Sequence, residues 1–103
     1  MTLVEILNHY YGSRGLSHPD FNDAIKFVIT EMAEACEIEL ARYPYLRNNP
    51  ANKPKFSKDA LATELGDAIM MLQVAGMAYG TDPLKALMEK LSDRGTVTYK
   101  LSI

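Results

Sequence analysis

The segment from Leu65 to Thr81 (LGDAIMMLQVAGMAYGT) contains one charged residue, Asp67, and this feature constrains the fold most. A stretch of this kind, preceded by a serine that can cap it and ended by a glycine, is typical of a helix. A helix that is apolar on every side is expected to be buried nearly all round, so other helices must surround it. Asp67 would then be protonated, paired with a Lys or Arg of another helix, or bound to a cation, because burying an unpaired carboxylate costs several kcal/mol.

The remaining sequence also shows helical spacing of apolar residues, with Ser, Pro and Gly at the ends of each pattern. The expected helices are residues 2–13, 17–42, 57–79 and 82–95, with Ser17 and Ser57 as N-caps of the second and third and Gly80 ending the third. Residues 43–56 contain three prolines and three asparagines and are expected to form a loop, and the tail, residues 96–103, is β-prone. With no internal repeat, the pattern predicts an all-α fold: four helices around one core, in a single domain of residues 1–103.

Composition limits the partners and the compartment. A chain of 103 residues that is 48% hydrophobic is expected to leave apolar surface uncovered, which favours homo-oligomerisation. A net charge of -2 provides no basic face for polymeric nucleic acid. The N-terminus carries Glu5 where a secretory signal needs an uninterrupted apolar run, and the single Cys36 is expected to be a buried thiol in a reducing compartment. The sequence thus predicts a cytoplasmic protein that does not associate with membranes.

The second predicted helix places acids beside its apolar face. At about 100° per residue, one broad apolar face collects Phe21, Ala24, Ile25, Val28, Met32, Ala35 and Cys36. Glu31 falls at the border of this face and Glu34 lies about one turn further on, whereas Glu37 rotates towards solvent. Glu31 and Glu34 are therefore the acids of this helix best placed to meet a neighbouring helix.

The third predicted helix repeats the spacing, with Glu64 and Asp67 three residues apart. Two antiparallel helices can therefore aim four carboxylates into one space, where they cannot all stay ionised without positive charge. Mg²⁺ prefers such oxygen ligands and keeps several waters, which leaves positions open for phosphate oxygens. Both histidines precede the acidic helices, so neither a zinc site nor a Glu-x-x-His di-iron site is indicated. The alternative is that Glu64 is a surface acid and Asp67 a salt-bridge partner.

At these residues, EMAE and ELGD, the sequence resembles the MazG-like all-α NTP pyrophosphatase superfamily over about residues 20–94. The resemblance implies a MazG-like bundle, working as a homodimer or homotetramer, that hydrolyses a nucleoside triphosphate or deoxynucleoside triphosphate to the monophosphate and pyrophosphate. It implies Mg²⁺, with Mn²⁺ as a substitute, as the cofactor. The residues that the resemblance assigns are Glu31, Glu34, Glu64 and Asp67 as metal ligands and Lys90 as a phosphate contact. Arg94 is a second candidate phosphate contact, with a cation at a helix C-terminus as the equal alternative.

The division of roles within the acidic set is open at this point. Glu34 is the predicted general base and Glu31 the other predicted catalytic acid, since base and ligand roles are shared in this family. Glu37 is a rival of Glu34 by geometry. Stacking on a base could come from aromatic residues, although residues of this kind more often belong to the core: Phe21, Phe27, Tyr43, Tyr45 and Phe56. Two other functions remain: a phosphoribosyl-ATP pyrophosphatase, and a non-catalytic helical module that senses nucleotides or mediates interactions.

Overall fold

The computed structural model describes residues 1–43 and 55–95, without the side chains of residues 93–95. Its helices are α1 (Leu3–Ser13), α2 (Phe21–Leu40), α3 (Lys58–Met77) and α4 (Pro83–Gly95). The predictions of an all-α chain and of four helices are confirmed for this part of the protein. The predicted loop lies largely outside the described residues, and the β-prone tail lies entirely outside them. No described helix combines the length and the apolar character that crossing a bilayer requires.

Side-chain caps decide where the first three helices begin. The Thr2 hydroxyl accepts the Glu5 backbone N–H at 3.1 Å, and the Glu5 side chain reaches back to the Thr2 N–H in a capping box. Ser57 caps α3 as predicted, accepting the Ala60 N–H at 3.2 Å. The predicted cap of α2, Ser17, is wrong, because Asp20 takes that role and accepts the Asp23 N–H at 2.8 Å.

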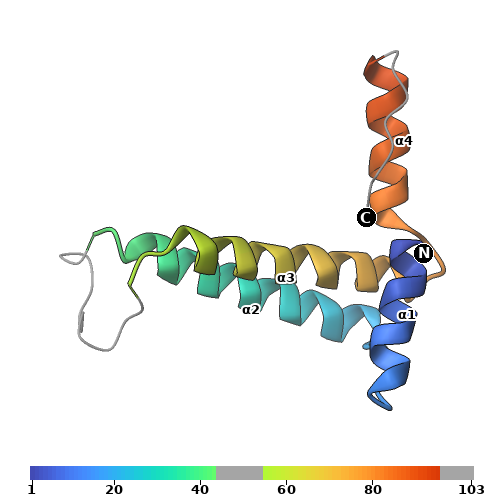
Figure 1. Cartoon of the computed structure of the whole chain (residues 1–103), viewed down its shortest axis with the longest axis horizontal. Helices are drawn as coiled ribbons and strands as arrows, with labels where there is room; N and C mark the ends of the chain where they lie inside the picture. The colour runs from blue at the N-terminus through green and yellow to red at the C-terminus, as the bar shows by residue number, and fades with distance from the viewer. Residues whose placement is uncertain (44–54, 96–103) are drawn as a thin grey trace.

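The long helices α2 and α3 lie side by side as an antiparallel hairpin, and α1 crosses one end of it (Figure 1). The described core lies under α1 at this end and consists of Leu7, Tyr11, Ala24, Met71, Val74 and Ala75. The core therefore takes residues from three helices, whereas α4 leaves the hairpin at the end of α3 and projects away from it (Figure 1). The expectation of four helices around one core holds for the number of helices but not for the position of α4.

The outer face of α3 is exposed, so the prediction that this helix is buried nearly all round is wrong for the single chain. Leu65, Ile69 and Leu72 are 39%, 51% and 49% exposed, and Asp67 is exposed on the same helix. The physical reason is that α2 and α1 cover one side of α3 while α4 turns away from the other. Cys36 is also exposed, which corrects its prediction as a buried thiol.

The buried face of α2 is narrower than the sequence predicts. Its buried residues are Ala24, Ala35 and Ile38. Phe21 and Met32, which were expected on the apolar face, are each more than 40% exposed. Two of these three buried residues are small alanines, and the larger side chains at the edges of the face remain in solvent.

A hydrogen-bonded elbow sets the direction in which α4 leaves α3. The buried Gln73 side chain donates from Nε2 to Asp82 Oδ1 at 2.8 Å and accepts the Leu84 backbone N–H at 2.9 Å. Gly80, with φ of 72°, provides the left-handed turn that ends α3, as its position in the sequence predicts. The elbow is therefore a built turn, held by a polar side chain whose hydrogen bonds offset the cost of its burial.

Two glycines of α3 provide a matched test of this elbow. A Cβ added at Gly76 would overlap the ring of Pro83, whereas one added at Gly66 meets no described atom within 4 Å. We expect Gly76→Ala to lower the free energy of unfolding by about 1–3 kcal/mol through overpacking, and Gly66→Ala to raise it by about 0.5–1 kcal/mol through helix propensity. Urea denaturation of the two variants measures both values, and shifts of the same sign and size would contradict a tight elbow.

Candidate metal centre

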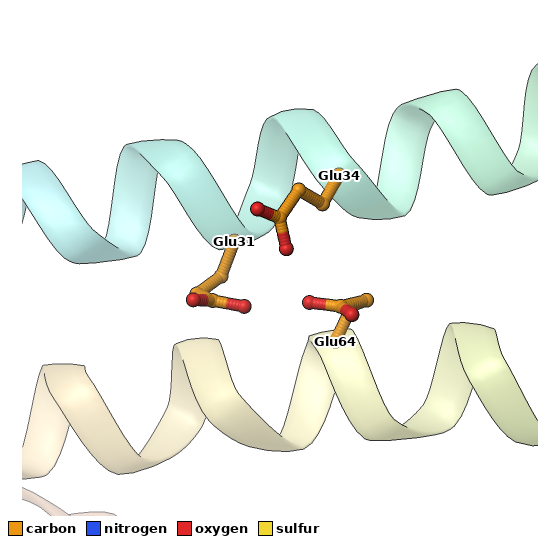
Figure 2. Close-up of side chains that lie close together, drawn as sticks. All are labelled: Glu31, Glu34 and Glu64. Carbon is orange, nitrogen blue, oxygen red and sulfur yellow. The ribbon is translucent and has the colours of Figure 1, made fainter. Parts of the chain in front are cut away.

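Three glutamate side chains converge between the two helices of the hairpin. Glu31 and Glu34 point from α2 towards Glu64 on α3 (Figure 2). One carboxylate oxygen from each of the three lies within 4.8 Å of the others. Residues three apart share a helix face, and antiparallel packing brings the facing acid of α3 between them. We call these three residues the glutamate cluster.

The glutamate cluster raises the pKa of two of its members. The pKa of Glu34 is raised first by its hydrogen bond with Glu64, then by the charge of Glu64, with smaller effects of desolvation and of the Asp67 charge. The pKa of Glu64 is also raised, first by its hydrogen bond with Glu31. A hydrogen bond between two carboxyl groups needs a proton on one of them, so it raises the pKa of one partner and lowers that of the other, and in both Glu34 and Glu64 the net effect is a raised pKa. The three acids therefore resist being ionised together.

One oxygen of the cluster, Oε2 of Glu64, is shielded from solvent and has no hydrogen-bond partner. Within residues 1–43 and 55–92, no Lys or Arg forms an ion pair with the glutamate cluster, and Arg42 pairs instead with Glu39 at 3.3 Å. A carboxylate oxygen that is shielded from solvent and has no hydrogen-bond donor is stabilised by a nearby positive charge. The cluster thus has the electrostatic character of a cation site.

The separation of the oxygens fits a small divalent cation. Oxygen ligands of Mg²⁺ lie at about 2.1 Å, so two ligands on opposite sides of the ion are about 4 Å apart. The spread of 4.8 Å among the three carboxylate oxygens exceeds that separation by less than an ångström, which small side-chain rotations can close. The all-oxygen donor set also suits Mg²⁺ or Mn²⁺ and not zinc. The residues present therefore fit the expected ion.

Asp67 lies beside the glutamate cluster and is not one of its three members. Its side chain is exposed, but its charge acts on Glu34 and Glu64. The sequence ranks Asp67 as the firmest ligand because it was expected to be buried, and that reason does not hold in the single chain. Glu37, the rival of Glu34, is exposed further along α2 and lies outside the cluster.

The two candidate phosphate contacts are not brought to the cluster by the single chain. Lys90 is exposed on α4, which leaves the hairpin at the far end of α3 from Glu64 (Figure 1). Arg94 lies in the last turn of α4, and its side chain is outside the described residues. Their roles remain predictions from the resemblance.

A cavity of about 430 Å³ opens next to the glutamate cluster. Its walls come from α1, the segment between α1 and α2, α2 and α3, and include Tyr10, Leu16, Phe27, Glu31, Asp67 and Met70. Of the aromatic residues that the sequence offered for base stacking, Phe27 lies on this cavity, while Phe21 packs against Tyr79 with ring centroids 5.6 Å apart. Tyr45 lies outside the described residues. Apart from Glu31 and Asp67 of the two acidic motifs, no sequence motif marks the other lining residues, because packing of α1 across the hairpin brings them together.

Comparison with known proteins gives no match, so a function can be proposed only from the sequence and the geometry of the site. No family model, curated protein or solved structure matches the chain. The described residues combine three converging carboxylates, raised pKa values for two of them and an adjacent cavity. This combination can hold a divalent cation and still leave space for a small organic ligand.

Proposed function

We propose that the protein is a Mg²⁺-dependent nucleotide pyrophosphohydrolase of the MazG-like all-α NTP pyrophosphatase superfamily. It cleaves a nucleoside or deoxynucleoside triphosphate to the monophosphate and pyrophosphate. The observation that carries the proposal is the convergence of Glu31 and Glu34 of EMAE with Glu64 of ELGD to within 4.8 Å. Acids that the resemblance pairs across some thirty residues of sequence are neighbours in space.

Glu31, Glu34 and Glu64 would hold Mg²⁺, with Mn²⁺ as a substitute, and Asp67, whose charge acts on Glu34 and Glu64, is the fourth proposed ligand. When bound, the ion would neutralise charge on the phosphates and acidify a water molecule. Glu34 is the acid that we propose takes the proton, because its carboxylate lies in the glutamate cluster beside Glu31 and Glu64. The water oxygen would bond to phosphorus while the P–O bond to the leaving pyrophosphate breaks.

A homodimer or homotetramer is part of this proposal. Both α3 and α4 expose apolar side chains in the single chain, namely Leu65, Ile69, Leu72, Leu87 and Leu91. These side chains are a large apolar surface for a chain of this size. A second subunit that covers these surfaces could also bring Lys90 of one chain towards the glutamate cluster of another. We propose the cytoplasm as its compartment, where a free, exposed Cys36 stays reduced.

The deciding experiment incubates the full chain and Mg²⁺ with a panel of NTPs, dNTPs and phosphoribosyl-ATP, and separates pyrophosphate from orthophosphate. Pyrophosphate from one or more NTPs or dNTPs would support the proposal and identify the base and sugar. Turnover of phosphoribosyl-ATP alone would identify the protein as a phosphoribosyl-ATP pyrophosphatase instead. Orthophosphate alone would mean a different reaction, and binding without product would leave a nucleotide-sensing module.

A further inference from the structure

The cavity and the glutamate cluster share a wall. Glu31 belongs to both, and Asp67 lines the cavity while its charge acts on Glu34 and Glu64. A ligand that fills the cavity therefore has one end beside the carboxylates. The volume of about 430 Å³ lies in the range of small-molecule sites.

The rest of the wall is apolar and aromatic. Phe27 and Tyr10 border the cavity with 51% and 39% of their surface exposed, and Met70 also lines it. The guanidinium of Arg14 covers one face of the Tyr10 ring at 3.9 Å, so Phe27 is the ring proposed to stack on a flat ligand, and such stacking tolerates every base. The thioether of methionine adapts its shape to a ring placed against it.

The α1 side of the cavity is held in place before any ligand arrives. Tyr11 is buried, its ring lies against that of His18 with centroids 4.5 Å apart, and its hydroxyl donates to Met71 Sδ at 3.9 Å. These contacts fix α1 and the segment after it against α3. A wall that is already ordered loses little conformational entropy on binding.

We infer that this cavity binds the nucleoside part of the substrate, with the base against Phe27 and the phosphates directed to the glutamate cluster. The inference rests on the proposed function and adds the part of the chain that selects the nucleotide. Tyr10 and Leu16 lie outside residues 20–94, the stretch that resembles the family, so the acidic motifs do not supply this site. A purely apolar ligand fits less well, because it would desolvate Glu31 and Asp67 without offering them a partner.

The test uses the protein with methyl-labelled methionines and reads binding without turnover. Nucleoside 5′-monophosphates of the common bases, in ribose and deoxyribose forms, are titrated against the Met70 and Met71 signals, assigned by Met→Leu variants. At least one nucleotide is expected to shift Met70 and Met71 and to leave Met88 of α4 unchanged. Phe27→Ala is expected to weaken that binding about tenfold or more, which is the loss when a base loses a stacking partner.

Phe21→Ala is the matched control. It removes the same side chain from the same helix, with similar exposure, at a position that does not line the cavity. It should bind the monophosphate with wild-type affinity. If no monophosphate shifts Met70 and Met71, or if Phe27→Ala binds like Phe21→Ala, the inference is overturned.

The test separates this inference from the proposed function. If Phe27→Ala releases pyrophosphate with the wild-type KM, the proposed hydrolase activity stands and the cavity is not the nucleoside site. If a monophosphate shifts the Met70 and Met71 signals, Phe27→Ala abolishes these shifts and the protein hydrolyses no nucleotide, the nucleoside site stands and the proposed hydrolase activity is wrong.

Discussion

Glu64→Gln is expected to slow pyrophosphate release from the preferred triphosphate by at least about 100-fold while leaving the helices folded. Glu64 faces Glu31 and Glu34 from the opposite helix and carries the shielded, unpartnered oxygen. An amide keeps its shape but loses the negative charge that a cation needs. Initial rates of pyrophosphate release, with helicity followed by circular dichroism, measure the effect.

The same variant should be more stable than wild type when divalent cations are removed. Because the pKa values of Glu34 and Glu64 are raised in the folded protein, the ionised cluster opposes folding at any pH above those values. A neutral amide at position 64 removes part of that repulsion. Adding Mg²⁺ should raise the melting temperature of wild type and have little effect on Glu64→Gln.

Two variants of α2 provide the control. Glu34→Gln is expected to lose activity as Glu64→Gln does, whereas Glu37→Gln, whose side chain lies outside the glutamate cluster, should keep it. Full activity in Glu34→Gln together with loss in Glu37→Gln would show that the cluster in the working enzyme uses the other acid.

Tyr11→Ala is expected to lower the free energy of unfolding by about 3–5 kcal/mol, the cost of removing a large aromatic side chain from a core. Tyr11 is one of the two buried residues of α1 and contacts both His18 and Met71. A loss of this size is a large part of the 5–15 kcal/mol typical of a whole domain. Urea denaturation measures it.

Two further variants show how much of this loss in stability comes from the Tyr11 ring, from its hydroxyl and from its buried position. Tyr11→Phe keeps the ring and loses only a long hydroxyl–thioether contact, so it should cost less than about 1 kcal/mol. Tyr10→Ala removes an exposed ring that stacks on Arg14 at 3.9 Å, and it should cost about 1 kcal/mol. A Tyr11→Ala protein no less stable than Tyr10→Ala would show that α1 does not depend on this core.

The sequence predicted the helices because their signals are local. Ser57 and Gly80 act through hydrogen bonds and backbone angles within a few residues, so their positions suffice to mark the ends of α3. Asp20 replaced Ser17 as the cap of α2 because both residue types cap well and only the backbone decides between them. The direction of α4 depends on Gln73 meeting Asp82 across a turn, which no periodic pattern contains.

The candidate site was predictable in part for the same reason. Spacing along α2 and α3 was enough to expect Glu31, Glu34 and Glu64 on facing sides, since helix geometry converts sequence distance into direction. The exposure of Asp67 was not predictable, because it depends on how α1 and α2 pack around α3. Of the residues that line the cavity, only Phe27, Glu31 and Asp67 were singled out from the sequence as candidate site residues, since its walls come from three helices and a connecting segment.

The attachment of α1 has a consequence for the order in which parts of the molecule can open. This helix of 11 residues is anchored by the buried Leu7 and Tyr11, whereas α2 and α3 support each other along their length. Segments with few buried contacts open locally at a lower free energy than the whole domain. Opening of α1 would remove one wall of the cavity while the glutamates stay between α2 and α3. Under the proposed function, release of the nucleoside and retention of the cation would therefore depend on parts of the chain with different local stabilities.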